Sequence, residues 1–300
     1  MVFVDSGDLF FDPAASASKQ QAQGKAKLIS RAYKRMQPLA LNIGDRDLFQ
    51  GIDFLRKEIS AGLPFISANL LDAATGGLVF PPYKIEKIAG WRIGFLGLMP
   101  EPPPHIKNAT GGSLLIRNPT EAAREWVHHL RGQVDFLVLL SDLGHNYDQQ
   151  IARAVPGIHF ILGGHDGRYM KYAQKEGGAF ILQSYTKGMY IGELRLTAEN
   201  TQAPFHDQRA ADRIRESMHD LDRRLSNSQR TQARQASPGL DSMIQEIQRQ
   251  KTSLQEELKR ELASPAQGNL FSWNLEPVEK VYPEDDKVLK WIEDAGIDKD

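Results

Sequence analysis

The apolar positions of the chain follow one pattern over its first two thirds and another beyond. Up to about residue 200, short apolar runs alternate with stretches of helical spacing, and most runs end at Gly, Asp or Ser. Runs that are apolar on both faces are typical of strands buried between two layers. We predict strands at residues 2–4, 39–43, 65–68, 91–98, 136–140, 159–162, 179–183 and 190–197.

The stretches between these runs predict helices at residues 25–36, 51–61, 119–132 and 148–154. The third has Pro119 at its start and Glu121 in its first turn, and both favour a helix N-terminus. Strands that alternate with helices indicate a layered α/β domain, which we place at residues 1–205.

From about residue 208 the spacing of apolar residues becomes close to heptad. Two narrow stripes flank the helix breaker at residues 237–239, and their members are Ile214, Met218, Leu221 and Leu225, then Leu240, Ile244, Ile247, Leu254 and Leu258. We therefore predict an antiparallel helical hairpin, of coiled-coil type, at residues 206–263. It is either a solvated arm that folds onto the domain or, through residues 207–262, a surface for self-association or a protein partner. Residues 264–300 are expected to form an extended strap and one short amphipathic helix.

Composition narrows the function classes. The net charge of -1 gives no electrostatic reason to expect nucleic acid as a partner. No apolar run approaches the roughly 18–20 residues needed to cross a bilayer, so membrane insertion is not expected. The absence of cysteine excludes disulfides and thiolate metal sites in this sequence, but it does not decide the compartment.

Four of the predicted strands end in residues that can bind metals. Asp5 and Asp8 follow the first strand, Asp45 and Asp47 the second, Asp142 and His145 the fifth, and His165 and Asp166 the sixth. Any one such stretch is explained by the turn-forming tendency of Asp and Gly. Because the carboxyl ends of strands in an α/β sheet converge on one rim, the four together indicate a divalent-metal site.

The same stretches resemble the motifs of a known superfamily. VDSGDLFF, IGDRD, LLSDLG and PGIHFILGGHDG resemble, in order and spacing, the motifs of the calcineurin-like metallophosphoesterases. ISANLL, FPPYKIEKIAGWRIGFLGL and QSYTKGMYIGELRL are similar to the 5'-nucleotidase (UshA-like) branch. The resemblance covers roughly residues 1–200. It implies a two-layer β-sandwich flanked by helices, a dimetal centre on one rim, and hydrolysis of phosphoesters.

The departures from the family pattern concern mainly one of its two metals. In the family, an opening strand supplies an Asp and a His to this metal, and that strand has no counterpart here. We expect this to reflect residues missing upstream of Met1. Gly167 stands at the last motif position and has no side chain to offer a metal. The positions that match the second metal are Asp8, Asp45, Asp142 and His165. We therefore expect one divalent ion, with a second doubtful. A carboxylate-rich shell favours Mn²⁺, Mg²⁺, Ca²⁺ or Fe²⁺ over Zn²⁺.

Arg46 stands where the family has its catalytic histidine. Arginine stays protonated near neutrality, so it does not donate a proton, but it can bind phosphate and stabilise developing charge. The alternative is that Arg46 only pairs with Asp45 or Asp47. We take Arg46 and Asp45 as catalytic candidates, and as additional site candidates His145, Asp166, Asp47 and Asp5. The substrate-binding residues cannot be identified from the sequence.

Three functions are compatible with these patterns. The first is a metal-dependent hydrolase of small phosphorylated substrates with a one-metal site. The second is a catalytically weak or silent scaffold of the same fold that binds a partner through its hairpin. The third is a cation- or phosphate-binding module without turnover. By resemblance the protein is periplasmic or secreted if a signal precedes Met1, and cytoplasmic if the chain is complete.

Overall fold

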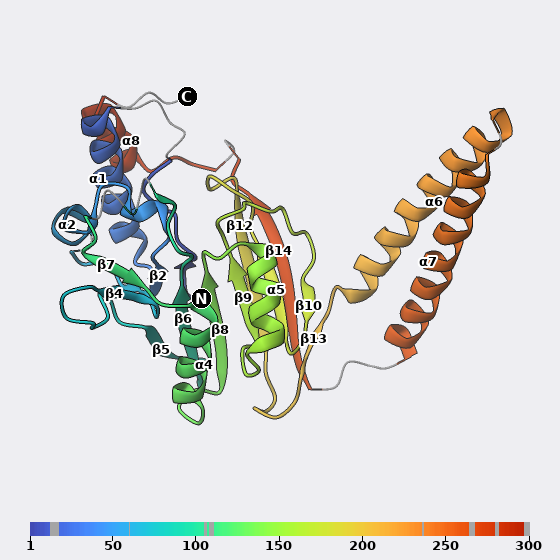
Figure 1. Cartoon of the computed structure of the whole chain (residues 1–300), viewed down its shortest axis with the longest axis horizontal. Coiled ribbons are helices and arrows are strands. Elements are labelled where there is room, and N and C mark those ends of the chain that lie inside the picture. Colours follow the sequence, from blue (N-terminus) through green and yellow to red (C-terminus); the bar gives the residue numbers. More distant parts are fainter. Residues whose placement is uncertain are drawn as a thin grey trace. The chain divides into compact units, whose positions relative to one another are not determined.

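A computed structural model describes residues 1–12, 18–59, 61–104, 107, 111–235, 237–263, 268–279 and 282–296. The chain forms two compact units, one of Met1–Gly192 with Leu275–Asp300 and one of Glu193–Asn274 (Figure 1). None of the helices in the described ranges combines the length and apolar character needed to cross a bilayer.

The first unit is built on two main sheets. The larger has six strands in the order β10-β11-β9-β8-β6-β5. Its members are β5 (Tyr83–Ile88), β6 (Trp91–Leu98), β8 (Phe136–Ser141), β9 (Phe160–Gly163), β10 (Gln174–Glu176) and β11 (Ala179–Gln183). The four inner strands run parallel, and β5 and β10 pair antiparallel at the two edges. The smaller sheet is parallel, in the order β1-β2-β3, and comprises β1 (Val4–Asp5), β2 (Ala40–Asn42) and β3 (Phe65–Ile66).

These two sheets approach each other closely at Gly97 of β6. A Cβ atom at this position would lie 2.5 Å from Asn42 Oδ1 and 2.9 Å from the Ile66 carbonyl oxygen, so a side chain there would push the layers apart. Asn42 holds the contact, because its Nδ2 donates to the carbonyl oxygens of Ser6 and Leu98 at 2.9 and 2.8 Å. The predicted α/β fold with two sheet layers flanked by helices is confirmed.

Helices cover the outer faces of the layers. They are α1 (Lys19–Met36), the short turns η1 (Arg46–Leu48), α2 (Ile52–Phe54) and η2 (Leu55–Ile59), α4 (Pro119–Leu130) and α5 (His145–Ala154). Helix α1 begins earlier than the predicted residue 25, because Ser18 forms a reciprocal capping box with Gln21. Helix α4 begins as predicted, and Asn118 accepts from the amides of Thr120 and Glu121. Ser60, inside the predicted helix 51–61, lies outside the described residues.

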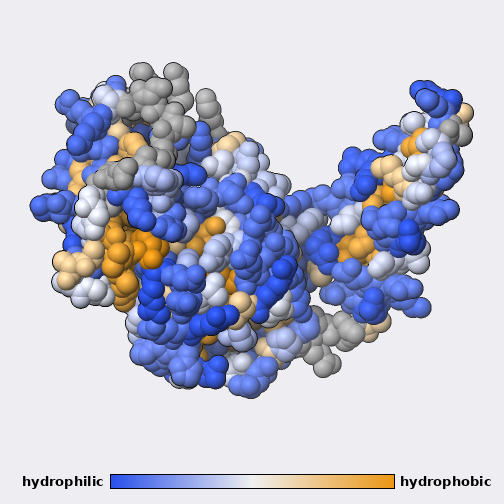
Figure 2. All heavy atoms as spheres, viewed as in Figure 1, coloured by the Kyte–Doolittle hydropathy of each residue, from blue (hydrophilic) through white to orange (hydrophobic). Residues whose placement is uncertain are grey.

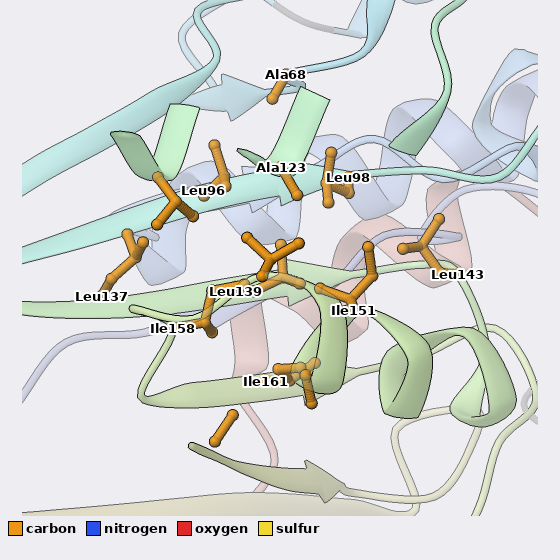
Figure 3. Packing of buried hydrophobic residues seen from close by; sticks show 14 of the residues in the cluster. Ala68, Leu96, Leu98, Ala123, Leu137, Leu139, Leu143, Ile151, Ile158 and Ile161 are labelled. Atoms are coloured by element: carbon orange, nitrogen blue, oxygen red, sulfur yellow. The ribbon is translucent and has the colours of Figure 1, made fainter. Parts of the chain in front are cut away.

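Two apolar clusters stabilise this unit. One lies between the six-stranded sheet and helices α4 and α5 (Figure 3). There Leu139 of β8 and Ile161 of β9 pack with Ile151 of α5, and all three side chains are fully buried. The other cluster joins the three-stranded sheet to α1 and η2, with Leu41, Ile43 and Leu55 at its centre. The rim between the carboxyl ends of the strands is thereby carried on two packed layers.

The second unit contains a small sheet and the predicted helical hairpin. The sheet has the order β12-β14-β13, with β12 (Tyr190–Thr197), β13 (Phe205–Asp207) and β14 (Asn269–Pro277). Helices α6 (Ala210–Arg234) and α7 (Pro238–Ala263) lie side by side (Figure 1). Four members of their apolar stripe, Ile214, Leu221, Ile244 and Ile247, are buried, and the other five are half-buried. The visible face of the hairpin is mostly hydrophilic (Figure 2).

Several strands were not predicted. They are β4 (Leu70–Asp72), β5, β7 (Leu114–Ile116), β10 and β13, which are short or carry polar residues on an exposed face. The expected strap contributes β14 to a sheet, and its short helix is α8 (Asp286–Asp294). Residues 264–267, 280–281 and 297–300 of that segment lie outside the described residues.

Candidate metal centre

Four residues from separate strand ends meet at one point on the rim of the first unit. Asp8, Asp45, Asp142 and His165 each offer a ligand atom, and these atoms all lie within 4.8 Å of one another. Asp142 follows β8 and His165 follows β9, which are parallel neighbours paired at Ser141 and Gly163. Chain segments that are far apart in sequence therefore converge because parallel strands end at the same edge of the sheet.

The imidazole of His165 lies at the centre of the group. Its Nδ1 atom is 3.4 Å from Asp8 Oδ2, 3.6 Å from Asp45 Oδ1 and 3.5 Å from Asp142 Oδ2. Asp45 and Asp142 are buried, whereas the His165 side chain keeps 31% of its surface exposed. The carboxylates of Asp45 and Asp142 therefore lie beneath the surface, and the imidazole is partly in contact with solvent.

Each of the four residues has a buried polar atom without a hydrogen-bond partner. These atoms are Asp8 Oδ2, Asp45 Oδ1, Asp142 Oδ1 and His165 Nδ1. Leaving a buried oxygen or nitrogen unpaired is costly, so buried polar groups in folded proteins are nearly always satisfied. Three carboxylates and one imidazole that converge in this way form a donor set that fits an oxygen-preferring divalent cation.

The backbone is constrained where it presents these ligands. Asp8 and His165 adopt left-handed conformations, with φ of 60° and 59°. Such angles are uncommon for residues other than Gly and are maintained only where the surroundings impose them. A side chain on Gly44 would collide with the carboxylate of Asp8 and with Asp142 Oδ2 at 2.8 Å, so the turn after β2 requires glycine.

Backbone amides orient the carboxylates, and Arg46 joins the group by its side chain. Asp8 Oδ1 accepts from the Arg46 amide at 2.9 Å, and Asp142 Oδ2 accepts from the Asp45 amide at 3.1 Å. Arg46 Nε lies 3.2 Å from Asp8 Oδ2, and Arg46 Nη2 donates to the His165 carbonyl oxygen at 3.3 Å. The ion pair of Arg46 is thus with Asp8, rather than with Asp45 or Asp47 as the alternative prediction had it.

The cluster takes up protons when no cation is bound. Burial, followed by repulsion from Asp8, raises the pKa of Asp45 and holds that of Asp142 well above its usual range. Contacts with Asp142 and Asp8 raise the pKa of His165 to about 10, because the surrounding carboxylates favour the imidazolium. A divalent cation would replace these protons and supply the positive charge that they provide.

The remaining acidic candidates after β1 and β2 support the backbone of the rim. Asp47 is fully buried, and its carboxylate accepts from the amides of Asp8, Phe10 and Gly44 at 3.1, 3.0 and 2.9 Å. Asp5 accepts from the Gly7 amide and from the hydroxyl of Tyr33 at 3.0 and 2.8 Å. These hydrogen bonds of Asp5 and Asp47 hold together the turns that carry Asp8 and Asp45.

His145 and Asp166 lie together beside the cluster. Asp166 Oδ2 accepts from the His145 amide at 3.1 Å and from Arg168 Nε at 3.0 Å. His145 is buried, and burial lowers the pKa of its imidazole. Both residues are outside the group of four whose ligand atoms converge.

Sequence reasoning did not single out Ser141, Asp148 and Gln183, which form a buried polar group next to the rim. The Ser141 hydroxyl donates to Asp148, and burial raises the pKa of Asp148 to about 7. Asp148 shares the buried face of α5 with Ile151 and Ala152. An acidic residue on the apolar face of a helix was therefore the sequence signal that could have identified it. A Cβ at Gly163 would lie 2.6 Å from Asp148 Oδ2 and 2.7 Å from Gln183 Nε2, so this group packs directly against the strand end that leads to His165.

Known proteins resemble part of this chain in sequence. No family model matches the sequence. It is 31% identical over 192 residues to a 2',3'-cyclic-nucleotide 2'-phosphodiesterase/3'-nucleotidase of Yersinia enterocolitica, covering 55% of this chain and 29% of that protein. It is 27% identical over 186 residues to a 5'-nucleotidase of Vibrio cholerae, covering 51% of this chain and 34% of the relative. The matches therefore extend over about a third of the length of these curated relatives.

A solved structure resembles nearly the whole chain in fold. The calcineurin-like phosphoesterase YfkN from Bacillus subtilis superposes with a TM-score of 0.61 at 16% sequence identity, covering 98% of this chain and 82% of that one. At this identity the likeness concerns the fold alone.

Proposed function

We propose that this chain, which is similar in sequence to a 2',3'-cyclic-nucleotide 2'-phosphodiesterase/3'-nucleotidase and to a 5'-nucleotidase, is a metal-dependent phosphoester hydrolase with a one-metal site. The observation that carries the proposal is the convergence of Asp8, Asp45, Asp142 and His165, each with an unpartnered buried ligand atom. A purely structural cluster of acids at a buried rim would be expected to satisfy those atoms.

Charge balance supports one divalent ion. Three carboxylates carry three negative charges, and the guanidinium of Arg46 beside Asp8 offsets one of them. A single divalent cation offsets the other two, so the filled site would be neutral. Gly167, at the last motif position, has no side chain to offer a second ion. The oxygen-rich shell favours Mn²⁺, Mg²⁺, Ca²⁺ or Fe²⁺ over Zn²⁺.

The bound ion would polarise a phosphoryl oxygen and lower the pKa of a coordinated water. The chain itself contributes position and charge. Arg46 is anchored at Nε by Asp8 and at Nη2 by the His165 carbonyl, and its side chain remains 37% exposed. A guanidinium fixed in this way can bind a phosphoryl oxygen and stabilise charge that develops on it. The amides of Arg46 and Asp45 hold the carboxylates in place while that happens.

The substrate class follows from the relatives only as a proposal. Their names describe nucleotidases and a cyclic-nucleotide phosphodiesterase, so small phosphorylated metabolites such as nucleotides are the first candidates. The alternative is a silent scaffold that binds a partner through the hairpin of α6 and α7, where part of the apolar stripe is only half-buried.

Hydrolysis of bis(4-nitrophenyl) phosphate and a nucleoside monophosphate, with Mn²⁺, Mg²⁺ or Zn²⁺ added, tests the proposal. The wild type should be active with Mn²⁺ and inactive with chelator. Asp8→Ala should lose activity, whereas Asp53→Asn, which changes an exposed acid on α2, should keep it. Activity that is equal in Asp8→Ala and wild type would refute the mechanism, and metal binding without any turnover would favour the scaffold.

A further inference from the structure

A cluster of three tyrosines lies on the same rim as the candidate metal centre. The rings of Tyr169, Tyr185 and Tyr190 contact one another edge to face, with centroids 6.1 Å apart for Tyr169 and Tyr185, 5.1 Å for Tyr169 and Tyr190, and 6.0 Å for Tyr185 and Tyr190. Buried tyrosines in such contacts would be ordinary core residues. Here, however, 50% of Tyr169 and 40% of Tyr185 remain exposed.

The topology places these tyrosines close to His165. Strands β9 and β11 are parallel neighbours, and Gly163 is paired with Gln183 at their carboxyl ends. His165 and Tyr185 each stand two residues beyond that pair, and neighbouring strands are about 4.8 Å apart. After His165 the chain folds back along the extension of β11, because the Tyr185 amide donates to the Arg168 carbonyl at 3.0 Å and Tyr169 bridges to Ser184.

The loop after β11 is fixed in an unusual conformation. Tyr185 has a φ of 73° and Lys187 a φ of 56°, in the left-handed region that large side chains rarely adopt. The loop is held by contacts with the segment after His165 and with the segment after Asp8. A Cβ at Gly167 would lie 3.0 Å from Thr186 Cβ, and Lys187 Nζ lies 3.9 Å from Asp12 Oδ2 in the segment after Asp8. Strained backbone that is held in place in this way is typical of binding sites.

We propose that Tyr169 and Tyr185 form an aromatic platform that stacks against a planar aromatic ring carried by the leaving group of the phosphoester, such as an aryl ring or the base of a nucleoside. This rests on the proposed function, since the phosphoryl end of the ligand would lie at Arg46 and the metal centre. Rigid aromatic rings give large contact area at low conformational cost, and base–aromatic stacking tolerates different rings. Tyr190 supports the two exposed rings from the side at which β12 begins.

Binding of two non-hydrolysable ligands to the Mn²⁺-loaded full chain tests the platform without requiring turnover. Phenylphosphonate and methylphosphonate share the phosphoryl end and differ in the planar ring. The wild type should bind phenylphosphonate about 3- to 10-fold more tightly than methylphosphonate. Tyr169→Leu and Tyr185→Leu should each reduce this preference toward one. Tyr169→Phe and Tyr185→Phe should keep it, and the Phe and Leu variants of Tyr185 carry the same backbone strain.

The outcomes separate the two proposals. If both phosphonates bind equally well to the wild type, or if the Leu variants keep the full preference, the platform is wrong while the hydrolase proposal stands. If Mn²⁺ binds but neither phosphonate does, both proposals fall. Tyr169 does not have a left-handed backbone, so its Leu variant tests the platform even if Tyr185→Leu does not fold, and Mn²⁺ binding reports folding in each variant.

Discussion

The candidate metal centre and the helical hairpin bury residues of opposite kinds. At the centre, Asp45 and Asp142 are buried polar residues whose carboxylates lie within 3.6 Å of His165 Nδ1, and each has one oxygen without a hydrogen-bond partner. In the described part of the hairpin the buried side chains are apolar except for Ser228. Its charges lie outside, as in the pairs of Arg213 with Glu257 at 2.7 Å and of Lys251 with Asp222.

The difference shows which region is arranged for stability and which for binding. Burying apolar area in the hairpin stabilises the fold directly, and exposed ion pairs add little. Burying carboxylates that repel one another opposes folding, so the centre must be maintained by the surrounding layers. Residues that lower the stability of the free protein and have free ligand atoms are best explained by a cation that offsets the cost.

The strongest test of this comparison removes one buried charge from the centre. Asp142→Asn should weaken Mn²⁺ binding on the order of a thousandfold, because a ligand and a negative charge are lost together. Without metal the same variant should unfold at an equal or higher temperature than wild type, since repulsion among the carboxylates is relieved. Thermal unfolding with and without Mn²⁺ measures both effects. A large loss of stability in the metal-free variant would show that Asp142 is structural.

The matching test in the hairpin removes apolar volume. Ile247 is 1% exposed, and Ile247→Ala should destabilise the hairpin by about 2–4 kcal/mol through lost burial and the cavity left behind. Amide hydrogen exchange should accelerate in α6 and α7, while Mn²⁺ affinity and exchange in β8 and β9 stay unchanged. Leu262→Ala, at an exposed position of α7, is the control. Weakened Mn²⁺ binding in Ile247→Ala would contradict the independence of the two regions.

The pH dependence of Mn²⁺ binding tests whether His165 is a metal ligand. The pKa of His165 is raised to about 10, so the imidazole is protonated at neutral pH in the free protein. Mn²⁺ must displace this proton, and the apparent affinity should therefore rise about tenfold per pH unit between pH 6 and 8. Calorimetry in buffers of different ionisation enthalpy should show release of at least one proton. Affinity that is independent of pH would mean that His165 is not a ligand.

The parts of the fold that sequence could predict are those in which one local pattern determines the outcome. Strands β6, β11 and β12 were predicted with their observed bounds, because each is a continuous run of strand-forming residues. The convergence of Asp8, Asp45, Asp142 and His165 could be predicted from a motif order that places each at a strand end.

Features that depend on contacts between distant segments could not be predicted. The place of β14 between β12 and β13 depends on pairing across the whole hairpin, which no local period encodes. The choice of Asp8 as the partner of Arg46 is decided by where two loops meet. The tyrosine cluster depends on the fold-back after His165.

The smallest expected effect concerns α8, a third region that is neither an apolar core nor a binding site. In the first unit it is held to α1 by Arg31, whose guanidinium lies 3.7 Å from the centroid of the Trp291 ring, and by the pairing of Arg35 with Asp285 at 2.7 Å. Both contacts are partly solvated, so a double-mutant cycle of Arg31→Met and Trp291→Leu should give a coupling of about 0.5–1 kcal/mol. Chemical denaturation at low and high salt measures it. Because neither Arg31 nor Trp291 belongs to the group of ligand residues, Mn²⁺ affinity should remain unchanged. A coupling above about 2 kcal/mol would instead make α8 part of the core that carries the rim.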